Sequence, residues 1–186
     1  MPRSPLALAA FALAITLAPS HAAPAQAQSA VKQADMEGVF MGYEGEWHHT
    51  TYQLLALAEA TPADKFGFRP EPGVRSTSEV YMHIVQANFW YLSIIGQPMP
   101  VDLKQDAEKA VTTKPEVIAW LKRSLEAMRA AHLKEPPGHL ARHVSVDGHT
   151  TTVDAIYLRA IIHTNEHMGQ LIAYARMSGV VPPWSQ

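Results

Sequence analysis

The sequence of 186 residues predicts an all-α fold, a four-helix bundle, that follows a cleaved signal peptide. Apolar residues recur at alternating spacings of three and four over four long segments, which is the pattern of helices that bury one face. Proline, glycine and helix-capping residues separate these segments. No alternating pattern of useful length indicates a β-strand, so the helices are expected to share one core.

The beginning of the chain has the layout of an export signal. Residues 6–18 form an apolar run after a short positive start, and small residues follow it. The run is too short to span a bilayer as a helix. It is typical of a secretory signal peptide, here cleaved after Ala22 or Ala27. We interpret residues 1–27 as the signal peptide and the start of a disordered leader, and residues 35–183 as the helical domain of an exported, periplasmic or extracellular protein.

Composition excludes several functions. The chain has no cysteine, so it has no disulfide, thiolate ligand, cysteine nucleophile or lipidated cysteine that could act as a membrane anchor. Its formal net charge is −2 at pH 7, and no basic block is present. This mild acidity argues against nucleic acid as a partner and against an anionic membrane surface.

The first long helix is expected from Asp35 to Ala60, where Thr61-Pro62 ends it. Its apolar positions are spaced as in a helix that faces a bundle core. They are Met36, Phe40, Tyr43, Trp47, Thr50, Leu54 and Leu57. A loop then extends to Arg75, because its proline and glycine residues disfavour regular structure.

A capping box at Ser76–Glu79 predicts the start of the second long helix. In this motif the serine hydroxyl and the glutamate carboxylate each accept a backbone N–H. Gly96 and Pro98 end the helix. Its buried face is expected to contain Val80, Ile84, Ala87, Tyr91 and Ile94.

Residues 101–111 are expected to form a short helix or a turn. The segment Thr113–Glu116 then has the form of a second capping box, with proline in the first helical turn. The third long helix ends at Pro136–Gly138, and its packing positions are Ile118, Leu121, Leu125 and Met128.

The segment from His139 to Thr150 is predicted to be irregular. Residues 151–154 cap the last long helix, and Gly179 lies where a left-handed residue commonly ends a helix. The buried face of this helix is expected to contain Val153, Tyr157, Ala160, Thr164, His167, Leu171 and Tyr174.

Two histidines four residues apart, His163 and His167, lie beside and on this buried face. Side chains at that spacing point in the same direction, so the two imidazoles can share a metal ion. The chain has ten histidines, which makes the spacing alone weak support. His139 and His143 repeat it in a segment without a helical pattern. We interpret that pair and His48-His49 as solvent-exposed.

His83 is the third candidate ligand, because it flanks the buried face of its helix on the same side as His163 does. Two packed helices could bring His83 to the His163/His167 pair. Buried imidazoles need partners, since an unpaired buried polar group costs about 1–3 kcal/mol. Three imidazoles leave a coordination position open on a divalent ion, as in catalytic sites. The alternative is a group of core histidines that are hydrogen-bonded to backbone or hydroxyl groups.

The segment His163–His167 also matches the zinc-peptidase motif H-x-x-E-H, in which the glutamate is a general base. That motif requires a further acidic ligand well downstream. Only nineteen residues follow, and none is acidic. Glu166 is also expected on the outer face of the helix. The peptidase interpretation is therefore disfavoured.

Four segments carry a resemblance to a known family: Leu54–Ala58, the loop Phe68–Gly73, Ser76–Asn88 with His83, and His163–Tyr174. In this order and spacing they resemble the DinB-like (YfiT-like) family of metal-binding four-helix bundles. The resemblance covers roughly residues 35–183.

This resemblance implies metal ligands at His83, His163 and His167, a divalent ion such as zinc or nickel, and a homodimer as an expected state. Family members with an assigned activity are similar to thiol-dependent transferases and isomerases. The DNA-damage association in the family name implies no DNA binding. Members usually lack a signal peptide, and their thiol cofactors belong to a reducing cytosol. The export signal therefore argues against thiol transfer but not against metal binding.

A divalent ion can lower the pKa of water that it binds to about 7. Glu46 and Gln170 flank the buried faces on the same side as the histidines, and are candidates for a proton acceptor and a hydrogen-bond partner. Their alternative role is that of polar residues at the bundle rim. Aromatic residues on the buried faces would then form walls of the pocket, with simple core packing as the alternative role; they are Tyr43, Trp47, Tyr91 and Tyr157.

Two function classes follow from these observations. The first is a metal-dependent enzyme of the transferase or hydrolase type that acts on a small molecule of unknown identity. The second is a non-catalytic bundle of the cell envelope that binds a metal or a small ligand. A plain interaction module is also compatible with a helical bundle.

Overall fold

The computed structural model describes residues 41–185. The predicted signal peptide and leader, and the predicted start of the first helix at Asp35, lie outside the described residues. Four long helices and one short helix make up most of the described chain: α1 (Gly42–Ala60), α2 (Thr77–Ile94), α3 (Ala107–Ala110), α4 (Lys114–Leu133) and α5 (Val153–Met177). Two strands, β1 (His143–Val146) and β2 (His149–Thr152), lie between α4 and α5. Short 3-10 turns occur at Ala63–Lys65, His139–Ala141 and Pro183–Ser185.

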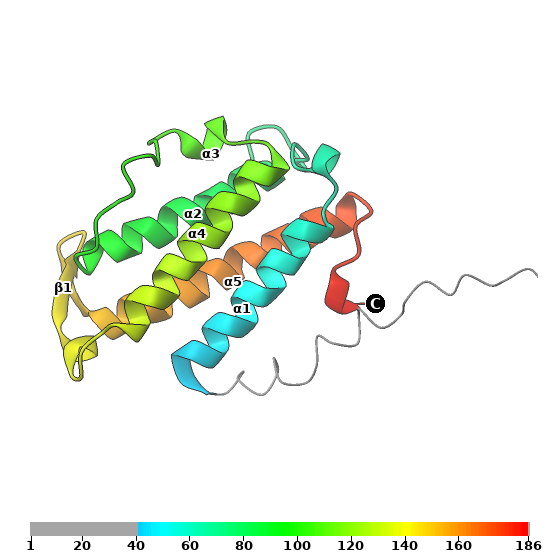
Figure 1. The fold of residues 1–186 in the computed structure, drawn as a ribbon. Helices are drawn as coiled ribbons and strands as arrows, with labels where there is room; N and C mark the ends of the chain where they lie inside the picture. Colours follow the sequence, from blue (N-terminus) through cyan, green and yellow to red (C-terminus); the bar gives the residue numbers. More distant parts are fainter. Residues whose placement is uncertain (1–40, 186) are drawn as a thin grey trace, which may run out of the picture. The chain divides into compact units, whose positions relative to one another are not determined.

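The four long helices pack around one core. Helix α2 lies against α4 and α5, and α1 lies against the same two helices (Figure 1). All four contribute fully buried side chains, among them Trp47, Leu54, Tyr81, Leu121, Met128 and Tyr157. Each large apolar side chain buried in this way contributes roughly 1.5–3 kcal/mol. The prediction of a mostly helical fold is confirmed.

Local capping explains where α2 and α5 begin. The Ser76 hydroxyl accepts the backbone N–H of Glu79, and the Glu79 carboxylate accepts that of Ser76, so the predicted capping box is formed. The bond from the Ser76 N–H is the main reason that the pKa of Glu79 lies below its usual value. At the start of α5 the Thr152 hydroxyl accepts the N–H of Ala155. After α5, Gly179 has a φ of +82°, as expected for a helix-ending glycine.

The second predicted capping box is not formed. Thr113 does precede α4, but its hydroxyl donates to the Glu116 carboxylate at 2.5 Å instead of accepting a backbone N–H. Pro115 lies in the first turn, as predicted. The start of α4 therefore depends on the proline and on packing rather than on a side-chain cap.

The prediction of an irregular segment without strands after α4 was wrong. Strands β1 and β2 pair antiparallel, with Val146 opposite His149, and Asp147-Gly148 connects them. Both connecting residues have positive φ, 49° and 80°. Mirror-image two-residue turns require this conformation and favour Asp-Gly. The dipeptide is thus the signal from which the hairpin could have been predicted.

The hairpin packs at one end of the helices, with β1 against α2 and β2 against α5. The Arg142 guanidinium donates to the Ile95 carbonyl at 2.9 Å and so ties the hairpin to the end of α2. Within residues 41–185, no helix combines the length and the apolar character that crossing a membrane requires.

Candidate metal centre

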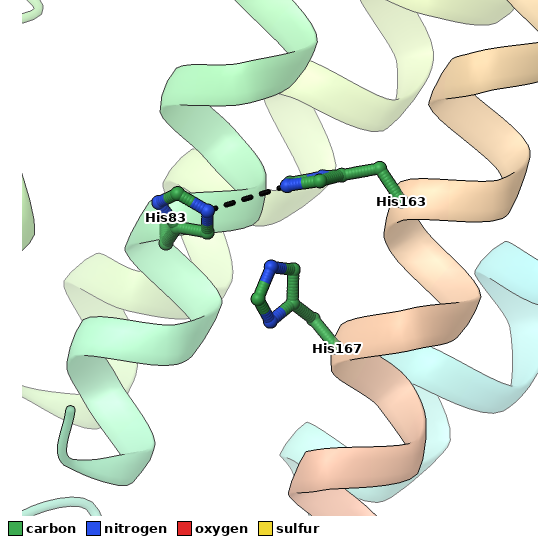
Figure 2. A group of neighbouring side chains, drawn as sticks. All are labelled: His83, His163 and His167. Carbon is green, nitrogen blue, oxygen red and sulfur yellow. Dashed lines mark hydrogen bonds between the residues drawn. The ribbon is translucent and has the colours of Figure 1, made fainter. Parts of the chain in front are cut away.

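Three histidines from two packed helices converge in the structure. His83 projects from α2, while His163 and His167 project from successive turns of α5, and the three rings point toward one another (Figure 2). The Nε2 atoms of His83 and His163 are 3.2 Å apart. One nitrogen from each ring lies within 4.8 Å of the others. The structure therefore brings together the three ligands predicted from the sequence.

The three histidines differ in depth. His163 is the most buried, with 8% of its surface exposed, whereas His83 and His167 are half-buried. The edge of the Tyr91 ring from α2 contacts His163, at 5.8 Å between ring centroids. The sequence pattern placed His167 on the buried face and His163 beside it. In the structure the order is reversed, because His163 is buried and His167 is half-buried.

Two of the histidines are held from outside the triad. His83 Nδ1 lies 3.2 Å from a carboxylate oxygen of Glu108, which comes from the short helix α3. His167 Nδ1 lies 3.0 Å from the side-chain oxygen of Gln170, whose amide donates to the Tyr174 hydroxyl. Because both partner oxygens accept, the hydrogen-bond network assigns the ring proton to Nδ1 in each case. Nε2 of each ring then presents a lone pair to the triad.

The facing lone pairs fit a cation. A lone pair on His83 Nε2 opposite His163 Nε2 at 3.2 Å requires a proton or a metal ion to offset their repulsion. Nδ1 of His163 is buried and has no hydrogen-bond partner within residues 41–185. Metal-binding histidines usually donate their second N–H to an outer group. Two of the three do so here, and His163 is the exception.

Burial favours the neutral forms of His163 and His83. It is the main cause that lowers the pKa of His163 to about 4, followed by the nearby His167 and His83. The pKa of His83 is also lowered, first by burial and then by Arg75 and His167, against the opposing effect of Glu108. A histidine binds metal through its neutral form. The environment therefore preserves the lone pairs that metal binding needs.

A polar cleft of about 790 Å³ adjoins the triad. Glu108 and Gln170, the residues that hold His83 and His167, are part of its wall. The other lining residues are Arg69, Gly73, Val74, Arg75, Glu79 and Lys109. Arg75 Nε donates to the second carboxylate oxygen of Glu108 at 2.7 Å. The three histidines do not line the cleft themselves, so a small molecule in it would contact Glu108 and Gln170, the hydrogen-bond partners of His83 and His167.

Sequence reasoning missed Glu108 and Arg75. Neither belongs to an apolar pattern, since Arg75 ends a loop and Glu108 lies on a helix of four residues. The path of the chain between α2 and α4 brings Glu108 next to His83, and the loop that leads into α2 brings Arg75 next to Glu108. The available sequence signal was that charged residues occur in the segments before and after α2, the helix that carries His83.

The two predicted pocket residues have different positions. Gln170 contacts His167 and lines the cleft. Glu46 is half-buried on α1, and no hydrogen bond in the described part of the chain joins it to the triad. Glu166 is exposed and pairs with Arg159 at 2.7 Å, which agrees with its predicted surface position.

The predicted aromatic walls are divided between two regions. Tyr91 contacts the triad. Tyr43, Trp47 and Tyr157 instead form a separate aromatic cluster, in which Tyr43 stacks on His132 at 3.9 Å. These three residues therefore belong to the core rather than to the cleft.

Within residues 41–185, the other two histidine pairs do not belong to the cluster of possible metal ligands. His139 and His143 are both exposed, and His139 pairs with Glu135. His48 is exposed on α1, and His49 is half-buried.

The fold and the triad together define a class of protein: a helical domain in which three histidines from two helices can hold a metal ion beside a polar cleft. The chain belongs to the DinB superfamily, whose family model matches residues 46–171. The resemblance inferred from the sequence is thereby confirmed.

The fold is similar to that of a DinB-like protein from Bacillus cereus ATCC 10987, with a TM-score of 0.66 and 19% sequence identity. The similarity covers 77% of this chain and 95% of the other. At this identity the likeness concerns the fold. A comparison with curated proteins finds no match.

Proposed function

We propose that this chain is an exported protein that binds a divalent metal ion through His83, His163 and His167 and acts as a metal-dependent enzyme of the transferase or hydrolase type. The observation that carries the proposal is the convergence of three imidazole nitrogens within 4.8 Å, next to a polar cleft that two of their hydrogen-bond partners line. Three protein ligands are typical of catalytic metal sites. When bound, such an ion supplies a Lewis acid with a free position for a substrate atom or water.

The residues around the triad have supporting roles in this proposal. Glu108 holds the His83 ring through Nδ1, and Gln170 holds the His167 ring in the same way. Such outer contacts fix ring orientation and tautomer and raise the basicity of the ligand. The cleft holds the substrate beside Glu108 and Gln170, the partners of His83 and His167. Imidazole suits zinc, nickel, copper and iron alike. Zinc or nickel is the proposed ion because the resemblance to the DinB-like family implies it.

One observation favours a non-catalytic alternative. Glu108 is the carboxylate hydrogen-bonded to the triad, and it is already engaged by both Arg75 and His83. An enzyme that needs a carboxylate base would have to release one of these contacts. A metal- or small-ligand-binding bundle of the cell envelope requires no such base.

Metal analysis of untagged protein tests the proposed centre. We expect near-stoichiometric zinc or nickel in the wild type and its loss in His163→Ala, because the most buried ligand is removed. His143→Ala is the matched control, since His143 is exposed on the hairpin. Zinc at a hundred times its Kd should also stabilise the wild type by about 2.7 kcal/mol, which corresponds to roughly 5–10 °C in Tm.

The same measurements can refute the centre. If the wild type holds no metal after reconstitution with either zinc or nickel, the triad is a group of core histidines. Equal metal content in wild type and His163→Ala would place the ion elsewhere.

A further inference from the structure

The cleft beside the triad carries a charge arrangement that indicates what it binds. We propose that it binds the carboxylate or phosphate group of a small anionic substrate, and that Arg75 is the residue that contacts this group. The inference rests on the proposed function, because it assigns a substrate class to the cleft next to the same metal centre.

Arg75 has N–H donors that are not used within the described chain. Its Nε donates to Glu108 at 2.7 Å, and its side chain is 40% exposed toward the cleft that it lines. Its two terminal amino groups form no hydrogen bond with any residue of the described chain. A guanidinium group can donate two parallel N–H bonds to a carboxylate or a phosphate. The Arg75 guanidinium is therefore held through Nε, while its two terminal amino groups are available to a ligand.

The charges of the cleft leave a positive excess. Arg69, Arg75 and Lys109 line it together with two carboxylates, Glu79 and Glu108. Each carboxylate is paired with an arginine: Glu79 with Arg69 at 3.3 Å, and Glu108 with Arg75 at 2.7 Å. Within residues 41–185 Lys109 has no salt-bridge partner. A concave surface with an excess of one charge concentrates ligands of the opposite charge.

The position of Arg75 relative to the triad is fixed by short contacts. One Glu108 oxygen accepts from Arg75, and the other lies 3.2 Å from His83 Nδ1. Arg75 also directly precedes Ser76, whose capping box starts α2, the helix that carries His83. Arg69 braces the loop by donating to the Val74 carbonyl at 2.8 Å. An anion held by Arg75 would therefore lie one side chain away from the imidazoles.

Calorimetric titration of zinc-loaded protein tests this assignment. The probes are succinate and inorganic phosphate, with succinamide as the neutral analogue of succinate. We expect the wild type to bind at least one of the two anions more tightly than succinamide. Tighter succinate binding assigns a carboxylate substrate, and tighter phosphate binding a phosphorylated one. We expect Arg75→Met to weaken anion binding about tenfold to a hundredfold, because charge-assisted bonds are lost.

Variants separate recognition of the anion from metal binding. Arg75→Lys keeps the positive charge but loses the two parallel N–H donors of the guanidinium. Its anion affinity should therefore lie between those of the wild type and Arg75→Met. Lys109→Met should weaken anion binding by a smaller factor. Arg129→Met is the control, because Arg129 lies on α4 and pairs with Glu44. Zinc content and Tm, measured on every variant, should match those of the wild type.

Two results would overturn the inference: equal binding of succinate, phosphate and succinamide by the wild type, or unchanged anion affinity in Arg75→Met. If the wild type holds no metal, the proposed function fails separately. The titration of metal-free protein then decides the inference, because the excess charge of the cleft does not depend on the ion.

Discussion

At the scale of single residues, Glu108 connects the two sites described above. One of its oxygens accepts from Arg75, which faces the cleft, and the other lies next to His83 Nδ1. A carboxylate in this position keeps the His83 proton on Nδ1 and its lone pair directed at the triad. His163 has no comparable partner, so the orientation of its ring depends on burial and on the contact with Tyr91.

Replacing Glu108 should weaken metal binding without removing it. Loss of an outer partner typically costs 10- to 100-fold in metal affinity, and we expect a loss of this size for Glu108→Ala. Glu108→Gln should retain more affinity, since its amide oxygen can still accept from His83. Competition with a chromogenic chelator measures both values.

Glu59→Ala is the control for this pair of variants. Glu59 is an exposed carboxylate that pairs with Lys122 on the surface. If Glu108→Ala binds zinc as tightly as Glu59→Ala does, the contact between Glu108 and His83 has no role in the metal centre.

At the scale of elements, the helices begin in different ways. Helix α2 starts at a complete capping box that lies directly next to the cleft. Helix α4 starts after Thr113, whose hydroxyl donates to the Glu116 side chain instead of capping the helix. The same sequence pattern, Ser/Thr-x-x-Glu, therefore leads to two different local structures.

This difference predicts unequal effects of removing each hydroxyl. Ser76→Ala should lower the free energy of unfolding by about 1 kcal/mol, because an N-terminal N–H of α2 loses its acceptor. Thr113→Ala should cost less than half as much, since its exposed hydroxyl bonds no backbone group. Urea unfolding of both variants measures the two losses. Equal losses would mean that the cap of α2 does not contribute as described.

At the scale of the whole molecule, the candidate centre joins elements that are far apart in the chain. His83 and His163 are separated by 80 positions, and packing of α2 against α5 brings them together. A metal ion bound there would link the two helices, so metal binding and folding stability should be coupled. Because the chain has no cysteine, a bound metal ion rather than a disulfide would connect the two helices.

Export predicts a shortened mature chain. We expect the protein recovered outside the cytoplasm to begin at Ala23 or Gln28, as cleavage after Ala22 or Ala27 requires. Mass spectrometry of the intact protein measures this mass. Leu13→Arg interrupts the apolar run and should leave a full-length chain in the cytoplasm. Full-length wild-type protein found only in the cytoplasm would contradict the signal peptide.

The sequence by itself determined the helical class, the start of α2 at Ser76 and the three histidines. These inferences succeed because helical periodicity, capping and the spacing of His163 and His167 are local properties of the chain. The Asp147-Gly148 turn was equally local, and the hairpin was missed because its strands are too short to show a clear alternation.

Only the tertiary structure decided what surrounds the triad. Four features depend on how the helices pack and how the loops run between them. They are the burial of His163, the contact of Glu108 with His83, the free amino groups of Arg75 and the lack of a hydrogen bond between Glu46 and the triad in the described residues. Contacts between residues far apart in sequence are selected by packing of the whole core, and no local pattern records them. The convergence of the three histidines was thus predictable from the chain, whereas the cleft and its charge arrangement required the fold.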